Sequence, residues 1–560
     1  MTNEERLGTM MDSKLNRRTL GVGAAGVAGA AALVGKLGGI SAQRAFAQDD
    51  DSNTLKLTIG ASANVGLNPI GIRTLGAFYL QSCIYDGLVQ SSPDWNSVEM
   101  GLAESFDVSD DGTVYTFHLR EGVTWHDGEA FTADDVLFTY HTMLKQAIGS
   151  YMASTMFIVD GAEAYFNGEA ETISGIEAVD DNTVTFTLTA PNAPFTFSIL
   201  TQHSIIPEHI WSGVSDEDLT KPGTWESGHV GTGPFQFSQY LPDQFLELVR
   251  YDDAWRGAPL LDRILFIHVG TTPDAYAAAL ENGDIDYAGG LPASEYERMS
   301  AIESLTMYSK PVYNIRFLSM NVAKPYLSDV RVRQAIAYAI DRQGIADAII
   351  SYGGVFTDNL TPSTTWANPD VPKYTYDPEM AKSLLADAGW DPDQELVVSL
   401  YYQDQAHADS IATVQQMLTE VGINATVLQL DGSAVQDYYY NNAEFDVMLG
   451  GFGVSPDFDE YSRIFMTEAV WPSGQNAMKY SNTRVDELFI EGRTTVEEAA
   501  RKTAYDEIQV ILAEELPWLP FYNLNLVAGM NKRVVDGEAI VNAWNRPYNW
   551  NIEKVSIASE

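Results

Sequence analysis

The sequence predicts a mixed α/β fold that follows an N-terminal export signal. Three observations lead to this prediction: turn residues precede segments with an apolar residue at every second position, capped segments carry apolar residues at helical spacing, and the two kinds of segment alternate in the second half of the chain. Such an alternation is typical of sheets covered by helices. No solenoid repeat and no low-complexity linker interrupts the chain.

The N-terminal segment has the features of a secretory signal peptide, residues 1–47. Arg17 and Arg18 precede a run of mostly Ala, Gly, Val and Leu from Leu20 to Val34, and Ala45-Phe46-Ala47 fits a cleavage site. The paired arginines resemble a twin-arginine signal, and an uncleaved anchor is the alternative. Cleavage after about Ala47 would leave 513 of the 560 residues outside the cytoplasmic membrane.

Charge and cysteine content limit the partners of the mature chain. The formal net charge of −44 becomes −47 when the segment before the cleavage site is removed. Such a surface repels nucleic-acid phosphates and anionic lipid, so a nucleic-acid role is not expected. A saline habitat, a cationic ligand or solubility alone could each explain the charge. The sole cysteine, Cys83, cannot form an internal disulfide. No later run of about 18 apolar residues is present, so a soluble mature protein is expected.

Two β-hairpins are predicted in the first half of the chain. Each begins with turn residues, Asp110-Asp111-Gly112 in one case and Asp181-Asn182 in the other. The apolar positions that follow at a period of two are Tyr115, Phe117 and Leu119, and Val184, Phe186 and Leu188. This pattern is typical of half-buried strands.

Three helices with clear ends are predicted in the second half. Ser328 is expected to cap a helix whose apolar face contains Val332, Ile336 and Ile340. Asp377-Pro378 begins a second helix, which ends at Gly389. A third helix is expected over about 410–420, ending at Gly422, and a strand over 423–430 follows it.

The segment 116–140 is rich in chemically active side chains, with two histidines, one arginine and five carboxylates. His118 is predicted to point outward from a strand and His126 to lie in a turn. Their spacing across that turn is no zinc-binding pattern. Thr132 and Asp135 fit a capping box at the start of a helix. We therefore expect the polar side of a folding unit here, and neither a catalytic nor a metal site.

The same region resembles a known family. The stretch LAESFDVSDDGTVYTFHLREGVTWHDGEAFTADDVLFTY is similar to the N-terminal signature of family 5 extracytoplasmic solute-binding proteins, the peptide, nickel and oligosaccharide receptors of ABC importers. Six further blocks keep the order of that family: GTGPFQF (231–237), ENGDIDYA (281–288), LSDVRVRQAIAYAIDR (327–342), YDPEMAKSLLADAGW (376–390), FDVMLGGFGVSPDFDEY (445–461) and YSNTRVDELF (480–489).

The resemblance implies a two-lobe periplasmic-binding-protein-like α/β fold of class C, with an extra α+β domain inserted in lobe I. The expected parts are lobe I at 54–84, 216–308 and 521–560, the additional domain at 85–215, and lobe II at 309–520. Crossings near Pro311 and Pro520 would form a hinge that closes on a small-molecule ligand, an oligopeptide or oligosaccharide. The expected partners are ABC permease subunits, and the receptor is expected to be a monomer.

The resemblance also indicates where a peptide ligand would bind, and this sequence departs from the family there. In peptide receptors of the family an aspartate holds the α-amino group, and in the dipeptide binders an arginine holds the carboxylate. Phe452 stands for the usual Trp and Ser455 for that aspartate; Asp457 or Asp459 could substitute only if the loop is shifted. Segment 395–417 contains no Lys or Arg, so a buried carboxylate would have no cation there. A dipeptide is therefore disfavoured, while longer peptides and oligosaccharides stay open.

Aromatic and neutral polar side chains in the matching segments suit sugar rings as well as uncharged peptide. The candidate ligand-binding residues are Trp366, Tyr401, Tyr402, Gln403, Phe452, Ser455, Asp457 and Asn314, with Asn321 as a weaker candidate. Trp366, Tyr402 and Phe452 are the leading three. Any of these aromatic residues could instead belong to the core.

No cofactor or metal is expected. Nickel or haem would be a family option, but the eight histidines are scattered, and His203 and His209 flank a proline. Asp457, Asp459 and Glu460 lack the spacing of an EF-hand. An enzyme is not expected, because the chain has no G-x-S-x-G, H-E-x-x-H or G-K-[ST] motif. A secreted hydrolase with paired carboxylates, whose separation is a tertiary property, is the distant alternative.

Overall fold

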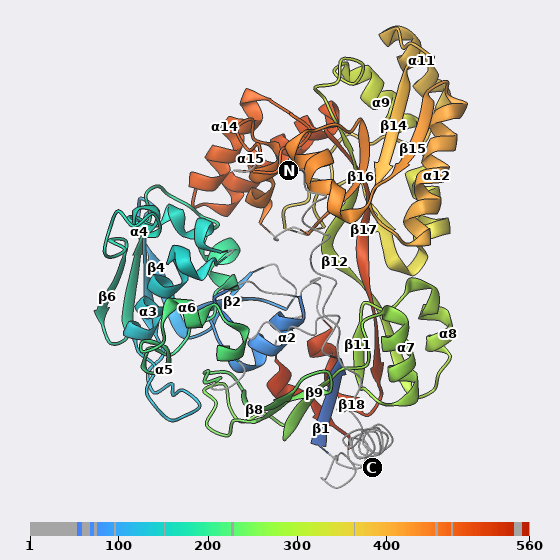
Figure 1. Ribbon diagram of the computed structural model, residues 1–560. Helices are drawn as coiled ribbons and strands as arrows, with labels where there is room; N and C mark the ends of the chain where they lie inside the picture. The colour runs from blue at the N-terminus through green and yellow to red at the C-terminus, as the bar shows by residue number, and fades with distance from the viewer. Residues whose placement is uncertain are drawn as a thin grey trace, which may run out of the picture. The chain divides into compact units, whose positions relative to one another are not determined.

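The computed structural model in Figure 1 describes residues 53–58, 68–71, 75–93, 97–150, 152–225, 229–362, 365–453, 457–471, 474–541 and 551–558. The predicted signal peptide, with its paired arginines and cleavage site, lies outside these residues. Residues 54–558 form one unit. None of the described helices is long and apolar enough to cross a membrane.

Among the described residues, eleven strands form one mixed sheet in the order β15-β14-β16-β12-β17-β11-β1-β10-β9-β8, with β13 paired to β17. The strands are β1 (Thr54–Thr58), β8 (Phe235–Leu241), β9 (Phe245–Arg250), β10 (Arg263–Ile267), β11 (Tyr287–Gly289), β12 (Leu305–Met320), β13 (Gly354–Phe356), β14 (Glu395–Leu400), β15 (Asn424–Gln429), β16 (Val447–Gly453) and β17 (Trp518–Asn531).

The long strands β12 and β17 pair antiparallel in the middle of this sheet and run side by side in Figure 1. Their register shifts between Pro311 and Ile315 and again between Arg316 and Phe317, where Pro520 is the partner of Phe317. Proline has no N–H to donate to a ladder, so an irregularity at these positions is expected. Both predicted crossings therefore coincide with breaks in the pairing of the two strands.

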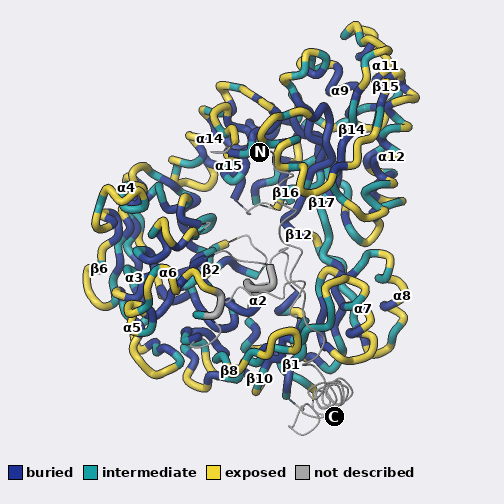
Figure 2. The backbone as a smooth tube through the Cα atoms, viewed as in Figure 1, coloured by how far each residue is buried: buried dark blue, intermediate teal, exposed yellow. Residues whose placement is uncertain are grey.

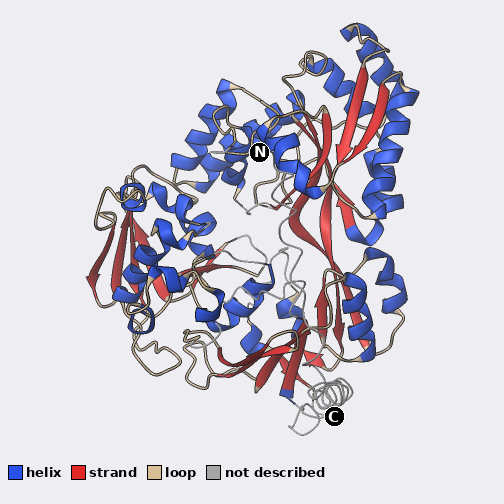
Figure 3. Cartoon of the chain, viewed as in Figure 1, coloured by secondary structure: helices blue, strands red, loops and turns tan. Residues whose placement is uncertain are grey.

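Alternate residues of β12 point to opposite faces of the sheet, as the pleat of a strand requires. Leu318 and Met320 pack in a core with α9 (Val330–Ala339), α11 (Pro378–Ala388) and α12 (Gln405–Glu420). Ile315 and Phe317 pack in a second core with α14 (Thr483–Thr494) and α15 (Glu498–Glu515). Helices thus cover both faces of this part of the sheet (Figure 3), and β16 and β17 are mostly buried (Figure 2).

At the other end of the two long strands, α7 (Pro273–Asn282) and α8 (Tyr296–Ser300) share a core with β11 and β17. Leu280, Met299 and Val527 belong to that core. The remaining elements near the large sheet are α2 (Leu75–Ile84), α10 (Arg342–Ile345), α13 (Ser462–Phe465) and the two-stranded pairs β2 (Val89–Ser91) with β3 (Val98–Met100) and β18 (Val534–Val535) with β19 (Ser556–Ile557).

A separate four-stranded sheet has the order β4-β5-β7-β6 and is entirely antiparallel. Its elements are β4 (Ala103–Val108), β5 (Val114–Leu119), β6 (Ile176–Asp180) and β7 (Thr183–Thr187), with α3 (Ala133–Met143), α4 (Ala162–Phe166), α5 (Glu208–Trp211) and α6 (Asp216–Leu219) around it. Both predicted hairpins are confirmed, and all six of their predicted apolar positions are buried.

The predicted helices are present, with two corrections at their N-terminal ends. Asp329, and not Ser328, caps α9, because the hydroxyl of Ser328 donates to the Pro325 carbonyl. The helix expected over 410–420 begins at Gln405, since Asp404 caps it by accepting from the His407 N–H. The helix over 378–388 has both predicted ends, with Gly389 in the left-handed conformation.

The polar segment 116–140 has a structural role. His126 Nε2 donates to the Gly233 carbonyl at 2.9 Å, and its Nδ1 accepts from the Gly231 N–H at 3.1 Å. These two hydrogen bonds connect the turn to the GTGPF segment. Burial lowers the pKa of His126 to about 4, although the hydrogen bond to Gly233 opposes this shift. The capping box is confirmed: the Thr132 N–H donates to Asp135 Oδ2 at 3.0 Å.

Candidate functional site

A groove of about 1030 Å³ lies along residues 522–527 of β17; we call it the β17 groove. Its described lining comprises Pro273 and Asp274 at the start of α7, residues 290–294 and Glu297, Val312 of β12, residues 348–353, residues 404–407 and Asp409 at the start of α12, and Tyr522, Leu524, Asn525, Leu526 and Val527 of β17. This lining contains four carboxylates and no Lys or Arg. The groove is therefore acidic along its described wall.

A small aromatic pocket of about 40 Å³ lies beside the end of β16. Tyr401 and Phe452, two of the predicted ligand-binding residues, line it together with Tyr440, Gln475 and Trp518. The Phe452 ring meets Trp518 edge-on with 6.0 Å between centroids. The structure thus brings Tyr401 and Phe452 to one place.

Three side chains, which we call the Arg316 stack, connect the aromatic pocket with the β17 groove. The rings of Tyr402 and His407 stack with centroids 4.2 Å apart, and the Arg316 guanidinium carbon lies 4.7 Å from the centre of the Tyr402 ring. Tyr402 also stacks on Tyr401 of the aromatic pocket at 4.3 Å. A cation over an aromatic face is a stabilising contact, strongest where water is excluded.

His407 is held from both of its nitrogens. Its Nδ1 lies 2.6 Å from Asp404, and its Nε2 accepts from the hydroxyl of Tyr522 at 2.9 Å and from Arg316 Nε at 3.4 Å. The hydrogen bond from His407 lowers the pKa of Asp404. Burial raises the pKa of Tyr402 and of Tyr522, so both phenols stay protonated at neutral pH.

Arg316 was not predicted as a site residue. The loop 401–403 has no cation of its own, but β12 brings this guanidinium to the Tyr402 ring from a distant part of the chain. The sequence held only a weak signal: Arg316 lies between the apolar Ile315 and Phe317, but the same strand also contains Lys310 and Asn314. A charged residue in a strand covered on both faces is unusual and points to a specific role.

Two other predicted residues lie in buried surroundings. Trp366 is 5% exposed and packs edge-on against Tyr505, with the Arg501 guanidinium 5.0 Å from its ring. Asn314 is 9% exposed and accepts a hydrogen bond from Arg316. Trp366 thus contributes to the core in this structure, while Asn314 positions a member of the Arg316 stack.

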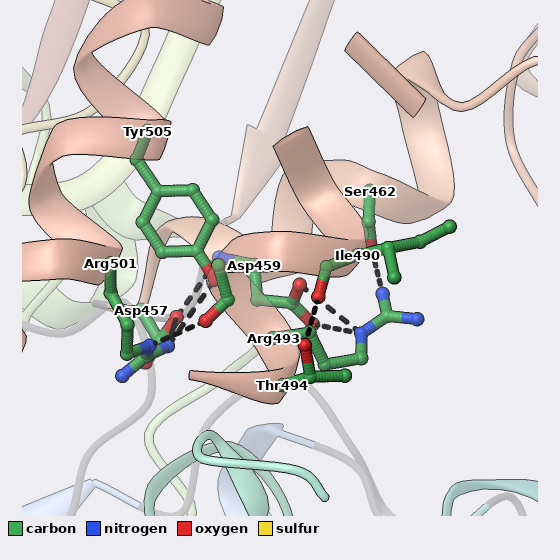
Figure 4. A network of polar contacts seen from close by, with 9 residues as sticks. Asp457, Asp459, Ser462, Ile490, Arg493, Thr494, Arg501 and Tyr505 are labelled. Carbon is green, nitrogen blue, oxygen red and sulfur yellow. Dashed lines mark hydrogen bonds and ion pairs between the residues drawn. The ribbon is translucent and has the colours of Figure 1, made fainter. Parts of the chain in front are cut away.

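The acidic residues after β16 are engaged in ion pairs (Figure 4). Both oxygens of Asp457 accept from Arg501 Nη2, at 2.8 and 2.7 Å, and Asp459 lies 3.0 Å from Arg493 Nε. Burial raises the pKa of Asp459 to about 6, with Arg493 acting in the opposite direction. Ser455, the other candidate here, lies outside the described residues.

The side-chain amides of two candidates, Gln403 and Asn321, donate hydrogen bonds to backbone carbonyls. Gln403 is exposed, and its Nε2 donates to the carbonyls of Tyr401 and Leu430 at 3.1 and 3.0 Å. Asn321 donates to the carbonyls of Ala443 and Phe445, which fixes the chain before β16. Over the part of the chain that the structure describes, no group of three or more His, Cys, Asp or Glu side chains is placed to hold a metal ion.

The arrangement is that of a binding surface: an acidic groove, an aromatic pocket, and a cation between them. Residues 97–472 match the family model "Bacterial extracellular solute-binding proteins, family 5 Middle". The chain belongs to this family. Its members are extracytoplasmic binding proteins and not enzymes.

Similar proteins match nearly the whole chain. The dipeptide-binding protein of Escherichia coli is 31% identical over 489 residues, which cover 84% of this chain and 89% of that protein. Heme-binding protein A of Haemophilus influenzae is 30% identical over 519 residues, covering 88% and 92%.

Solved structures agree with the fold. The ABC transporter substrate-binding protein CtaP of Listeria monocytogenes superposes with a TM-score of 0.79 at 26% identity, covering 91% of this chain and all of CtaP. The oligopeptide-binding protein AppA of Bacillus subtilis, solved with a nonapeptide, gives 0.70 at 25% identity, covering 90% and 99%. The fold is the two-lobe α/β fold of the family with an inserted α+β domain.

Proposed function

We propose that this protein is the receptor subunit of an ABC importer that binds a peptide-like solute in the β17 groove, against the Arg316 stack, and delivers it unchanged to permease subunits. It would act as a monomer outside the cytoplasmic membrane after removal of residues 1–47, without chemistry of its own. The relatives named for dipeptide and oligopeptide binding support a peptide-like solute.

The groove is the observation that carries this proposal. Its volume of about 1030 Å³ matches the upper end of small-molecule sites, which are roughly 300–1,000 Å³. Residues of β17 and of the starts of α7 and α12 line this space. A space of this volume holds an extended chain of several residues, contacted by the side chains of its lining.

The proposal includes the lobe boundaries stated above and a hinge at the two crossings. Residues 305–320 and 518–531 are the long paired strands, and their pairing is irregular next to Pro311 and Pro520. A few residues at strand irregularities can absorb the backbone rotations of closure. These features support a hinge in which β12 and β17 bend together.

Isothermal titration calorimetry of residues 48–560 with tetra-alanine tests the proposed function. We expect one peptide bound per chain and recovery of the uncut peptide by mass spectrometry afterwards. Binding should also raise the unfolding temperature, because a ligand at 100 times its Kd stabilises the folded state by about 2.7 kcal/mol. Cleavage of the peptide, or no heat of binding, would contradict the proposal.

An oligosaccharide is the second candidate, favoured by the aromatic pocket. Tyr401, Tyr440 and Phe452 offer ring faces, and Gln475 offers an amide. A cavity of about 40 Å³ is too small to enclose a sugar ring, so the ring would have to stack over its rim. Titration with maltotriose under the same conditions separates the candidates, since a sugar receptor would bind maltotriose and not tetra-alanine.

A further inference from the structure

We propose that the additional domain, residues 85–215, is a latch that holds the C-terminal end of α14 when the hinge is closed on the solute. The inference rests on the proposed function, which includes this domain and the hinge, and it gives the inserted domain a role in retaining the solute. We call the contacting residues the α14 latch: Gly112, Pro191 and Ala193 of the additional domain, and Arg493 and Val496 at the end of α14.

The first observation is a backbone hydrogen bond between two distant parts of the chain. The Ala193 N–H donates to the Arg493 carbonyl at 2.9 Å. Arg493 lies in the last turn of α14, where the carbonyls have no partner within the helix. The neighbouring Gly492 carbonyl accepts from Arg501 Nε at 2.9 Å. The additional domain thus supplies one of the hydrogen bonds that complete the end of a helix in the proposed lobe II.

An apolar contact lies beside this hydrogen bond. Gly112 is buried, and a Cβ atom added to it would lie 3.2 Å from Val496 Cγ2 and 3.3 Å from Pro191 Cβ. Gly112 has a φ of 70°, the left-handed conformation, in the turn before β5. The glycine therefore leaves space for Val496 and Pro191. Val496 is still 57% exposed, so the contact covers only part of its side chain.

The loop that carries Ala193 is held in shape by its own domain. Its sequence is Pro191-Asn192-Ala193-Pro194, and each proline fixes one backbone dihedral. The Tyr115 hydroxyl and the Phe195 N–H both donate to the Asn192 carbonyl, at 2.8 and 3.1 Å. A loop fixed in this way loses little conformational freedom when it meets its partner.

The end of α14 is fixed as well. Arg493 Nε lies 3.0 Å from Asp459, and its Nη2 donates to Ser462 Oγ at 2.6 Å (Figure 4). Two ordered surfaces therefore meet through one hydrogen bond and one apolar contact. Because an intramolecular hydrogen bond contributes little net stability, a contact of this size can form and break as the hinge moves. Its loss should speed the release of a bound solute.

A disulfide across the latch tests this inference, because the sole cysteine, Cys83, is buried. The variant is residues 48–560 with Gly112→Cys and Val496→Cys. A Cβ at position 112 lies 3.2 Å from Val496 Cγ2, which is one bond from the second Cβ. Disulfides join Cβ atoms that are about 3.5–4.5 Å apart, so the two thiols can pair.

Mild oxidation of this variant should close the disulfide when tetra-alanine is present. We expect the oxidised protein to release the peptide at least tenfold more slowly than the reduced protein. When the protein is oxidised without peptide, tetra-alanine added later should bind at least tenfold more slowly. Reduction should restore both rates, which separates the latch from damage caused by the substitutions.

Val496→Asp is a second variant that keeps Gly112. Its carboxylate would lie in an apolar contact next to the negative end of α14. We expect tetra-alanine to dissociate at least threefold faster, with little change in the unfolding temperature of the peptide-free protein. Val179→Asp is the matched control, because Val179 of β6 is also 57% exposed. It should release the peptide at the wild-type rate.

Three outcomes would overturn the latch while peptide binding itself would stand. These are thiols that stay reduced at saturating tetra-alanine, an oxidised protein that exchanges peptide like the reduced one, and a wild-type release rate in Val496→Asp. A wild-type protein that binds no tetra-alanine would instead overturn the proposed function. Thiol loss in the peptide-free double variant would then still show whether positions 112 and 496 meet, and thiols that stay free would overturn the latch as well.

Discussion

The buried ion pair of Asp457 and Arg501 gives the most quantitative test of which acidic residues are structural. The Asp457 side chain is 3% exposed and that of Arg501 is 8% exposed. Arg501 Nε also donates to the Gly492 carbonyl at 2.9 Å, so the guanidinium would stay in place if the carboxylate were removed. Asp457→Ala would leave a buried cation unpaired, which costs about 3–5 kcal/mol.

Urea unfolding of residues 48–560 measures this effect. We expect Asp457→Ala to lower the free energy of unfolding by about 3–5 kcal/mol. The double variant Asp457→Ala with Arg501→Met should recover most of this loss, because no charge is left without a partner. Asp409→Ala, which removes an exposed carboxylate of the β17 groove, should change the stability by less than about 0.5 kcal/mol.

An opposite pattern would refute this reasoning. If Asp457→Ala unfolded like the wild type but lost affinity for tetra-alanine and not for an N-acetylated form, Asp457 would be the residue that holds the ligand amine. The loop would then have to rearrange on binding and give up its contact with Arg501.

The remaining predictions concern acid stability, the packing at Gly451, and two of the three leading aromatic candidates. Because the pKa of His126 is lowered in the folded protein, the unfolded chain takes up a proton more readily. The free energy of unfolding should therefore fall as pH decreases from 6.5 toward 4, by at most about 1.4 kcal/mol per pH unit. Urea titrations at each pH should give a flatter profile for His126→Gln. Gly451→Ala should lower the free energy of unfolding, because its Cβ would lie 2.3 Å from both Arg316 Nη1 and the Tyr402 hydroxyl; urea unfolding identical to that of the wild type would contradict this. Trp366→Ala should lower the free energy of unfolding by about 3–5 kcal/mol. Phe452→Ala should instead weaken ligand binding with a smaller loss of stability. The opposite result would mean that Phe452 belongs to the core and Trp366 to the binding site.

Local structure could largely be predicted from the sequence because its signals are local. The turn before Tyr115 and the alternation after it need no distant partner, and the cap at Asp377 with Pro378 and Gly389 defines a helix by itself. The cap of α9 was misplaced by one residue because two capping residues are adjacent there. Only the hydroxyl contact of Ser328 with Pro325 decides between them.

The site could be predicted only in part, because its contacts are tertiary. Arg316 and His407 are 91 positions apart and meet through the strand order β14-β16-β12. Asp457 and Arg501 are 44 positions apart, and nothing local indicates that α15 supplies the partner. Trp366 lies outside regular structure, where an aromatic residue could equally bind a ligand or fill the core. Tyr401 and Phe452 were candidates because the family resemblance marks both segments, and both line the aromatic pocket.

Native mass spectrometry of residues 48–560 with tetra-alanine tests the central claim most directly. The account predicts a mass increase of one uncut peptide on each chain, lost again as the uncut peptide on activation in the gas phase. A protein that gains no peptide mass at saturating concentration, or that carries only fragments of the peptide, would contradict it.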